Sequence, residues 1–433
     1  MYDKITEMAD ALEEKLIAYR RDLHKYAETG WLEMRTSSLI ASRLKVMGYE
    51  VLTGEAVCSA AARMGVPAKE ILEEHYQWAA ENGADQEFLP QTRGGFTGVI
   101  GILRCGEGPT VALRFDIDAL GVFEDKSLLH RPYAQNFCSV SDGMMHACGH
   151  DGHTAIGLGT AELLSKLKEH LHGTVKLIFQ PAEEGLRGAK AIVEKGHLDD
   201  VDYVLGGHLA DSEDNSLYVC PGMAGTLAST KLDAVFTGKS SHAGSAPQEG
   251  NNALLAAASA VLNLQAIPRH SGGASRINVG TLHAGSGRNV ICDRAKMELE
   301  VRGQTTEINE YMERYAREIL EHTALMHGCT VEIKEMGSAA AMECTSAFTE
   351  KICSVCSQEL HLSVREPKSM GGSEDYAYMA KRVIDRGGQA CFVGIGIPCM
   401  ALFHNKSFDF DERALPLGVK LYTGMIWNLL ANK

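Results

Sequence analysis

Two short stretches of the chain combine the side chains that metal-dependent hydrolysis requires. Cys148 and His150 lie among glycines in CGHDGH, residues 148–153, and Glu183 and Glu184 follow in PAEEG, residues 181–185. A thiolate and an imidazole suit zinc or a similar transition metal, and one carboxylate can complete the ligand set. The other carboxylate can then move protons. The combination indicates a metal-dependent hydrolytic site.

The elements that must position these residues alternate between strands and helices. Apolar, strand-like runs occupy residues 97–104, 110–115, 174–180 and 203–208, and a helical pattern occupies 154–170. Near-continuous apolar strands separated by helices predict an α/β fold with a doubly wound, mostly parallel sheet. Asp116, Asp118, the glutamate pair and His208 fall at or just past the carboxyl ends of these strands, where such sheets bind ligands.

A different pattern between residues 227 and 336 predicts a second domain. It reads strand, helix, two strands, helix and strand, which is typical of a ferredoxin-like α+β sheet with helices on one face. Alternation of helices and strands then resumes, so this domain is predicted to be inserted between residues 1–226 and 337–433. Residues 402–405 are expected to return to the first sheet, and the Ala/Glu-rich segment 55–92 to be helical.

Length and composition predict an ordinary globular protein of two domains. The 433 residues are 45% hydrophobic and 23% charged, enough for a substantial core. No apolar run is long enough for a membrane span, and the amphipathic N-terminus does not resemble a signal peptide. Twelve scattered cysteines suggest reduced thiols, so we expect a cytoplasmic protein. A net charge of -14 without a basic stripe disfavours nucleic acid and membranes as partners.

Motifs over nearly the whole chain resemble those of a metallo-aminoacylase and carboxypeptidase family. This family contains hippurate hydrolase, N-acyl-amino-acid amidohydrolases and plant auxin-conjugate hydrolases. The motifs are RFDIDAL at 114–120, MHACGHDGH at 145–153, QPAEEG at 180–185, SHAG at 241–244, GSED at 372–375 and FHN at 403–405. The resemblance implies a metal-binding catalytic domain with an inserted lid and dimerisation domain.

The resemblance also implies two divalent metal ions. The implied ligands are Cys148, His150, Glu184, His208 and His404. Zinc is the first expectation and manganese the alternative, because a resemblance does not fix the ion. Asp116 stands where relatives orient a ligand from the second coordination shell, although a carboxylate at a strand end can equally be an ordinary solvated group.

Two further residues are expected to act on the substrate during hydrolysis. Glu183 is expected to be the general base that takes a proton from water and later protonates the departing amine. His242 resembles the family's lid histidine, which stabilises the oxyanion and usually does so in the site of a neighbouring protomer. We therefore expect a homodimer formed through the lid. Judged alone, His242 would more readily be a surface histidine.

The substrate-binding residues are predicted from charge and from close backbone approach. Arg288, Asn289 and Arg276 lie in or near glycine-rich runs, and arginine suits a substrate carboxylate in an acidic protein. Each arginine alone could be a solvated surface charge. Gly372 and Ser373 are implied by the resemblance to approach the substrate, although the serine could instead cap a helix.

A narrower likeness within the family favours one substrate, p-aminobenzoyl-glutamate, cleaved to p-aminobenzoate and glutamate. It is carried by YAETGW at 26–31, GGFTG at 94–98, GGASRINVG at 272–280 and AGSGRNV at 284–290. Another aromatic N-acyl amino acid, such as indole-acetyl-aspartate or hippurate, is the alternative substrate. A third possibility is a weakly active structural subunit that supports a related second chain in a hetero-oligomeric hydrolase.

Overall fold

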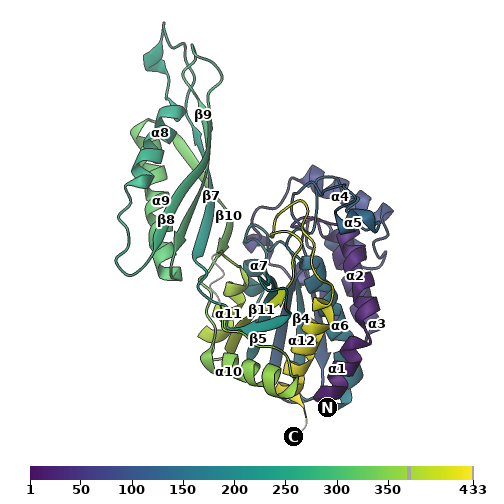
Figure 1. Ribbon diagram of the computed structural model, residues 1–433. Helices are drawn as coiled ribbons and strands as arrows, with labels where there is room; N and C mark the ends of the chain where they lie inside the picture. The colour runs from purple at the N-terminus through teal and green to yellow at the C-terminus, as the bar shows by residue number, and fades with distance from the viewer. Residues whose placement is uncertain (368–371, 432–433) are drawn as a thin grey trace. The chain divides into compact units, whose positions relative to one another are not determined.

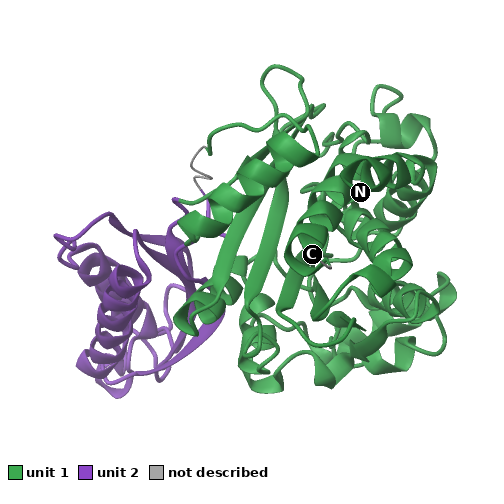
Figure 2. Ribbon diagram, turned by 90° about the horizontal axis from the view of Figure 1, so that it is seen from below, with its two compact units in different colours: residues 1–224, 343–369, 375–433 green, residues 225–342, 370–374 purple. Residues whose placement is uncertain are grey.

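The chain forms two compact units in the computed structural model, which describes residues 1–367 and 372–431 (Figures 1 and 2). Unit 1 comprises Met1–Ala224, Glu343–Ser369 and Asp375–Lys433, and unit 2 comprises Gly225–Met342 and Met370–Glu374. The insertion expected at residues 227–336 lies within the range of unit 2.

Seven strands form the sheet of unit 1, in the order β1-β2-β4-β3-β5-β11-β6. Their bounds are β1 Glu50–Thr53, β2 Val99–Arg104, β3 Thr110–Asp116, β4 Thr174–Gln180, β5 Tyr203–Asp211, β6 Tyr218–Pro221 and β11 Gln389–Ile397. The four central strands run parallel, as expected for a doubly wound sheet. The edge strands β1 and β6 pair antiparallel, as does β2 with both of its neighbours, so the sheet is mixed. Antiparallel edges are common on otherwise parallel sheets.

Helices cover both faces of this sheet. The helices of unit 1 are α1 Tyr2–Asp10, α2 Glu13–Lys25, α3 Met34–Val46, α4 Lys69–Glu81, α5 Arg131–Ala134, α6 His150–Leu167, α7 Ala189–Glu194, α10 Ser346–Ser354, α11 Tyr376–Asp385 and α12 Ala414–Leu430. A Cβ added at Gly206 in β5 would lie 2.7 Å from the Tyr376 ring of α11, and one at Gly207 would lie 2.6 Å from the Tyr422 hydroxyl of α12. Successive strand residues face opposite sides, so α11 and α12 pack on opposite faces, at a distance only glycine permits.

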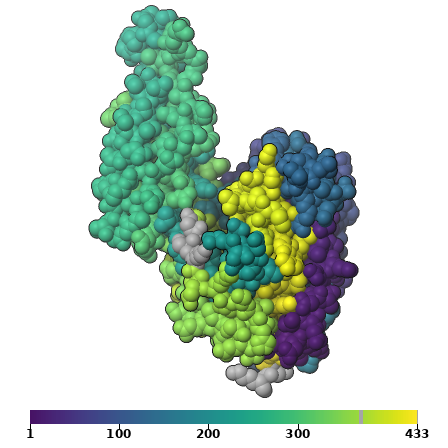
Figure 3. Space-filling view, viewed as in Figure 1, coloured from purple at the N-terminus to yellow at the C-terminus, as the bar shows by residue number. Residues whose placement is uncertain are grey.

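The two ends of unit 1 pack against each other. N-terminal residues, purple, lie beside C-terminal residues, yellow, on the surface shown in Figure 3. Asn428 of α12 donates to the Tyr2 hydroxyl at 3.1 Å, and Lys420 pairs with Asp10 at 2.6 Å. These contacts hold the N-terminal helices on the sheet domain.

Three expected elements differ in the structure. The helix expected from residue 154 begins at His150, because Gly149 in the left-handed conformation (φ +84°) starts it directly after Cys148. Segment 55–92 contains one α-helix, α4, and otherwise short 3₁₀ turns and loops. Residues 402–405 form an irregular turn rather than a strand, since the His404 amide donates to the carbonyl of Ala147. The last contact joins this turn to the cysteine motif.

Unit 2 is the expected ferredoxin-like unit. Its antiparallel sheet has the order β10-β7-β9-β8. The elements are β7 Ala228–Thr237, α8 Ala253–Gln265, β8 Ser275–Ala284, β9 Arg294–Gly303, α9 Thr306–Met326 and β10 Thr330–Ala339. Met297 and Leu299 of β9 are buried in a core with residues of α8 and α9, whereas Glu300 and Arg302 are only partly buried. One face of the sheet is therefore covered by helices and the other is polar. Among the described residues of either unit, no helix is long and apolar enough to cross a membrane.

Candidate metal centre and active site

The predicted metal ligands all belong to unit 1 and lie at or near the carboxyl ends of its parallel strands. They are Cys148 before α6, His150 at the first position of α6, Glu184 after β4, His208 in β5 and His404 after β11. Parallel strands end at the same edge of a sheet, so their loops meet there. Residues far apart in the sequence are thereby gathered.

The ligand atoms of these residues lie within reach of shared metal ions. The Sγ of Cys148 is 3.4 Å from Nε2 of His208, and Nε2 of His404 is 3.5 Å from Oε1 of Glu184. Cys148, His150 and Glu184 each offer a ligand atom within 4.8 Å of the other two. Cys148, His150 and Glu184 therefore form a cluster that could hold metal, and His208 and His404 each have a ring nitrogen 3.4 or 3.5 Å from one of its ligand atoms.

The orientation of the histidines fits metal binding. Nδ1 of His150 lies 2.9 Å from the carbonyl oxygen of Asp118, and Nδ1 of His208 lies 2.6 Å from that of Leu209. A carbonyl only accepts, so Nδ1 carries a proton in both rings, and Nε2 offers a lone pair once the ring has lost its second proton. Nε2 of His150 and Oε1 of Glu184 are buried without a hydrogen-bond partner among the described residues. Buried acceptors of this kind need a partner, and a divalent cation would supply it.

The pKa values of three side chains in the cluster also favour a bound cation. Burial lowers the pKa of His208 to about 3, so its imidazole is neutral and can act as a ligand. Burial raises the pKa of the Cys148 thiol well above its usual range. Burial and the nearby Asp118 also raise the pKa of Glu184. A bound dication would stabilise the charged forms of both ligands, which their protein surroundings alone disfavour.

Asp116 faces the cluster from the end of β3. Its carboxylate accepts hydrogen bonds from His153 Nδ1 and from Arg114 at 2.6 Å, and it lies 3.8 Å from Nε2 of His150. Burial alone would raise the pKa of Asp116, but His150, His153 and Arg114 hold it well below its usual range. Asp116, His150, His153 and His208 form a second group of possible ligands. His153, which was not among the predicted site residues, lies in the same motif as Cys148.

Asp118, which the sequence places at the same strand end as Asp116 but without a role, orients several residues of the site. Its carboxylate accepts the backbone N–H groups of Glu183 at 3.1 Å and Glu184 at 2.9 Å, while its carbonyl accepts from His150. Asp118 therefore fixes the glutamate pair and one histidine together. The available signal was its position two residues after Asp116 at the end of β3.

Glu183, the predicted general base, is directed at the same cluster. Its side chain is 8% exposed, and its Oε2 lies 4.0 Å from Nε2 of His150. The preceding Ala182 adopts a left-handed conformation (φ +51°), and its amide donates to the buried carboxylate of Glu33 at 2.7 Å. The sharp turn at Ala182 lets Glu183 and Glu184 approach the same cluster from different positions.

The segment at residues 55–92 contacts the glutamate loop through Arg187. The guanidinium of Arg187 donates from Nε to the carbonyl of Glu184 at 2.9 Å and from Nη1 to the carbonyl of Gly65 at 3.1 Å. Trp31 donates to the neighbouring carbonyl of Met64 at 2.7 Å. The segment therefore braces the loop that carries Glu183 and Glu184.

His242, the predicted oxyanion donor, lies in unit 2 and is exposed. Its Nδ1 accepts the backbone N–H groups of Gly244 and Ser245, both at 3.1 Å. In the neutral ring the proton must then lie on Nε2, which suits donation to an oxyanion. His242 also forms a β-bridge with Val290, and Ala243 donates to the carbonyl of Asn289.

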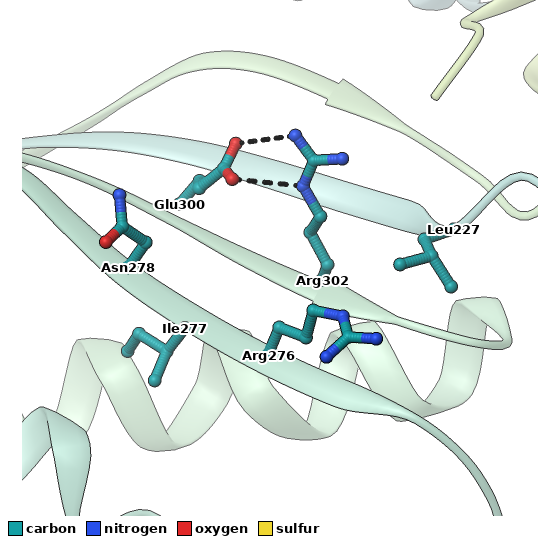
Figure 4. A pocket seen from close by; sticks show the side chains of 6 residues that line it. All are labelled: Leu227, Arg276, Ile277, Asn278, Glu300 and Arg302. Atoms are coloured by element: carbon teal, nitrogen blue, oxygen red, sulfur yellow. Dashed lines mark hydrogen bonds and ion pairs between the residues drawn. The ribbon is translucent and has the colours of Figure 1, made fainter. Parts of the chain in front are cut away.

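The predicted substrate-binding residues fall into two groups within unit 2. Arg288 and Asn289 lie in the exposed loop beside His242. Arg276 lies at the other end of β8 and lines a cavity of about 360 Å³ (Figure 4). Gly372 and Ser373 do not line this cavity but bind the backbone of one lining residue, since the Gly372 carbonyl accepts from the amide of Leu227 and the Ser373 hydroxyl donates to the Leu227 carbonyl at 2.8 Å. The serine hydroxyl thus fixes Leu227 and does not cap α11.

The α/β sheet and the cluster of thiol, imidazole and carboxylate ligands at its edge define a metal-dependent hydrolase of amide bonds. A comparison with protein families agrees with this class and specifies the family. The profile described as Peptidase family M20/M25/M40 matches residues 112–428, and the chain belongs to this family.

Individual relatives are similar over almost their whole length. The chain is 43% identical to the A subunit of p-aminobenzoyl-glutamate hydrolase from Escherichia coli (strain K12), covering 96% of both chains. It is also 43% identical to indole-3-acetyl-aspartic acid hydrolase of Enterobacter agglomerans, over 96% of both. These identities confirm the family resemblance drawn from the motifs.

Solved structures share the fold. An aminobenzoyl-glutamate utilization protein from Klebsiella pneumoniae superposes with a TM-score of 0.84 at 37% identity, covering 98% of this chain and 97% of the other. A Bacillus subtilis protein described as a dinuclear metal-binding peptidase of the M20 family gives 0.66 at 26% identity, covering 97% and 99%. The expected fold class is confirmed by these neighbours.

Proposed function

We propose that this protein hydrolyses the amide bond of p-aminobenzoyl-glutamate, releasing p-aminobenzoate and glutamate. The observation that carries the proposal is the cluster of Cys148, His150 and Glu184 with His208 and His404 beside it, together with a relative named for that activity at 43% identity over 96% of both chains. The complete ligand set argues against an inactive, merely structural role in a larger complex. Hydrolysis of indole-acetyl-aspartate is the second candidate, because the relative named for that substrate is equally identical.

The proposed metal content is two divalent ions, Zn²⁺ or Mn²⁺, held by Cys148, His150, Glu184, His208 and His404. Such ions lower the pKa of water to about 7 and polarise the scissile carbonyl. Glu183 takes the proton of the water that adds to the amide carbon, and it returns a proton to the glutamate nitrogen as the C–N bond breaks. Asp116 and Asp118 orient the ligands. The Nε2–H of His242 stabilises the oxyanion.

A substrate panel on the purified chain tests the proposal. After chelation, the enzyme is reloaded with Zn²⁺ or Mn²⁺ and assayed on p-aminobenzoyl-glutamate, indole-acetyl-aspartate and hippurate, with products separated by chromatography. We expect no turnover after chelation, recovery with metal, and the highest kcat/KM for p-aminobenzoyl-glutamate. A preference for indole-acetyl-aspartate would select the second candidate. No turnover by the chain alone with either metal would favour a required second subunit.

We further propose a homodimer formed through unit 2. Among the described residues its edge strand β8 pairs only with β9, and Leu254, Leu255 and Leu262 of α8 are 40%, 49% and 75% exposed. An unpaired edge beside exposed leucines suits a two-fold contact with a second copy. A cytoplasmic location is proposed because the twelve cysteines are all free thiols.

The double variant Leu255→Glu and Leu262→Glu is expected to be monomeric, because charges then replace the apolar face of α8. Light scattering after gel filtration measures this, and Val46→Glu, an exposed residue of α3 in unit 1, is the control that should leave the mass unchanged. If His242 acts in the site of the other protomer, kcat should fall when the dimer is lost. A wild-type chain that is fully active as a monomer would contradict the dimer and the shared site.

A further inference from the structure

Two of the free cysteines lie side by side in unit 1, at the point where the chain returns from unit 2. Cys344 follows shortly after Met342, the last residue of the main segment of unit 2, and Cys391 lies in β11. The amide of Thr345 donates to the carbonyl of Ala390 at 2.8 Å, and the amide of Ala390 donates to the Thr345 hydroxyl at 3.1 Å. Thr345 is thereby paired with Ala390, which places Cys344 beside Cys391.

The two sulfur atoms are hydrogen-bond partners. The Sγ of Cys344 accepts the amide of Phe392, the residue after Cys391, at 3.3 Å. The two thiols are also hydrogen-bonded to each other, and the Cys391 Sγ lies 3.5 Å from the hydroxyl of Thr349. A disulfide needs Cα atoms closer than about 7 Å, and opposite residues of paired extended segments are about 4.5–5.5 Å apart. The pairing therefore brings the two cysteines into the range of a disulfide.

The two thiols differ in acidity and in access to solvent. The hydrogen bond from Cys391 lowers the pKa of the Cys344 thiol, whereas the same hydrogen bond and burial raise the pKa of Cys391 well above its usual range. Cys344 is partly exposed, and Cys391 is fully buried. Oxidants react with the thiolate, and they must reach it from solvent. Cys344 is therefore suited to react first, and Cys391 to react with the oxidised Cys344.

We infer that Cys344 and Cys391 are a redox modification site and form a reversible disulfide when the protein meets a peroxide. The Cys344 thiolate attacks one oxygen of hydrogen peroxide, the O–O bond breaks, and a sulfenic acid forms while hydroxide departs. The Cys391 sulfur then attacks the sulfenic sulfur and the S–O bond breaks. The oxygen leaves as water with the Cys391 proton. Two thiols are thereby oxidised to a disulfide, and the peroxide is reduced to two waters.

Oxidation alters the contacts that hold the chain segments leading into and out of unit 2. The Cys344 thiol donates to the carbonyl of Met223 at 3.4 Å, and the Phe392 carbonyl accepts the amides of Gly222 and Met223 at 3.0 and 2.9 Å. Met223 lies just before Gly225, where unit 2 begins. A disulfide has no S–H to donate to Met223, and it joins the returning segment to β11 covalently. The modification therefore removes one contact of the outgoing segment and fixes the returning one.

Treatment of the purified, zinc-loaded protein with a small excess of hydrogen peroxide tests the inference. The remaining thiols are then blocked in denaturant, and unreduced tryptic peptides are identified by mass spectrometry. We expect a linked pair of peptides that contain Cys344 and Cys391, with a loss of two of the twelve thiols. Dithiothreitol should restore both. None of these measurements depends on the proposed function.

Single variants separate the roles of the two cysteines. Cys344→Ser should abolish the linked peptide. Cys391→Ala should leave Cys344 as a sulfenic acid that dimedone traps, because the second thiol is missing. Cys353→Ser is the matched control, since Cys353 of α10 is also partly exposed in unit 1 but burial raises its pKa. The control should form the same linked peptide as wild type.

The wild-type result decides the inference even if the variant of the buried Cys391 does not fold. A folded wild type that keeps all its thiols under peroxide would overturn it, as would a linked peptide that forms only after denaturation. Oxidation that joins other cysteines, or that takes Cys344 to sulfinic acid without a linked peptide, would overturn it as well.

Discussion

Glu183→Ala is expected to lose hydrolysis almost completely while the purified enzyme keeps its metal. General acid–base catalysis contributes about 10²- to 10⁴-fold to rates, so kcat should fall by about that factor. Metal content should stay at the wild-type level because the cluster atoms of Cys148, His150 and Glu184 lie together without Glu183. Release of p-aminobenzoate measures kcat, and elemental analysis of the same preparation measures metal.

A variant of the neighbouring Glu184 distinguishes a general base from a metal ligand. Glu184→Ala should lose metal as well as activity, because Glu184 supplies a buried carboxylate oxygen to the cluster. Glu107→Ala, in an exposed loop of the same unit, should change neither quantity. Equal metal loss in the Glu183 and Glu184 variants would make Glu183 a ligand. Wild-type turnover by Glu183→Ala would remove it from catalysis.

The candidate metal ligands could be predicted because their side-chain chemistry is local. Cys148 and His150 are neighbours in one motif, and Glu184, His208 and His404 follow apolar strand-like runs that end at one sheet edge. Both the residue types and the strand ends are visible in a single sequence. The spacing alone does not decide which glutamate is the ligand. The resemblance of the motifs to the family favoured Glu184 over Glu183.

The roles of residues that act through sheet neighbours were harder to predict than their positions at strand ends. Asp118 reaches the amides of Glu183 and Glu184 because β3 lies directly beside β4, and the order of strands in a sheet does not follow their order in the chain. Arg187 likewise gains its role from a carbonyl of a distant segment, that of Gly65. Pairings across such distances are set by tertiary packing, which leaves no periodic signal in the sequence.

Local composition was misleading for two of the expected elements. The helical pattern predicts the start of α6 too late because Gly149 and Gly152 weaken it, although a left-handed glycine is a natural way to begin a helix under a functional loop. The segment at 55–92 has a helical composition but folds largely as turns. Its main-chain groups instead meet partners such as Trp31 and Arg187, so tertiary contacts override propensity there.

Arg20→Leu is expected to cost about 3–5 kcal/mol of unfolding free energy at pH 7, the usual result of removing one partner from a buried ion network. Arg20 of α2 is fully buried and donates to Asp151 at 2.8 Å, to Asp409 at 2.9 Å and to Glu412 at 3.2 Å. Its removal leaves these buried carboxylates short of positive charge. Asp151 directly follows the proposed ligand His150, so metal affinity is expected to fall with stability.

The loss should depend on pH in a defined direction. Burial alone would raise the pKa values of Asp151, Asp409 and Glu412, but Arg20 and its neighbours hold all three below their usual values. Groups with lowered pKa values stabilise the fold above their unfolded pKa of about 4, and this contribution disappears as the pH falls through the folded values. The difference between wild type and Arg20→Leu should therefore be largest above about pH 5 and shrink in acid.

Urea unfolding at a series of pH values measures this difference, and Arg21→Leu is the matched control. Arg21 is the next residue of the same helix and pairs with Glu412 at 2.6 Å, but its side chain is 31% exposed. A half-exposed pair contributes about 1 kcal/mol or less, so the two adjacent arginines should differ severalfold. Equal losses from both variants would mean that burial does not strengthen the Arg20 network. A loss independent of pH would attribute it to side-chain packing over Phe410, whose ring centre lies 4.4 Å from the guanidinium.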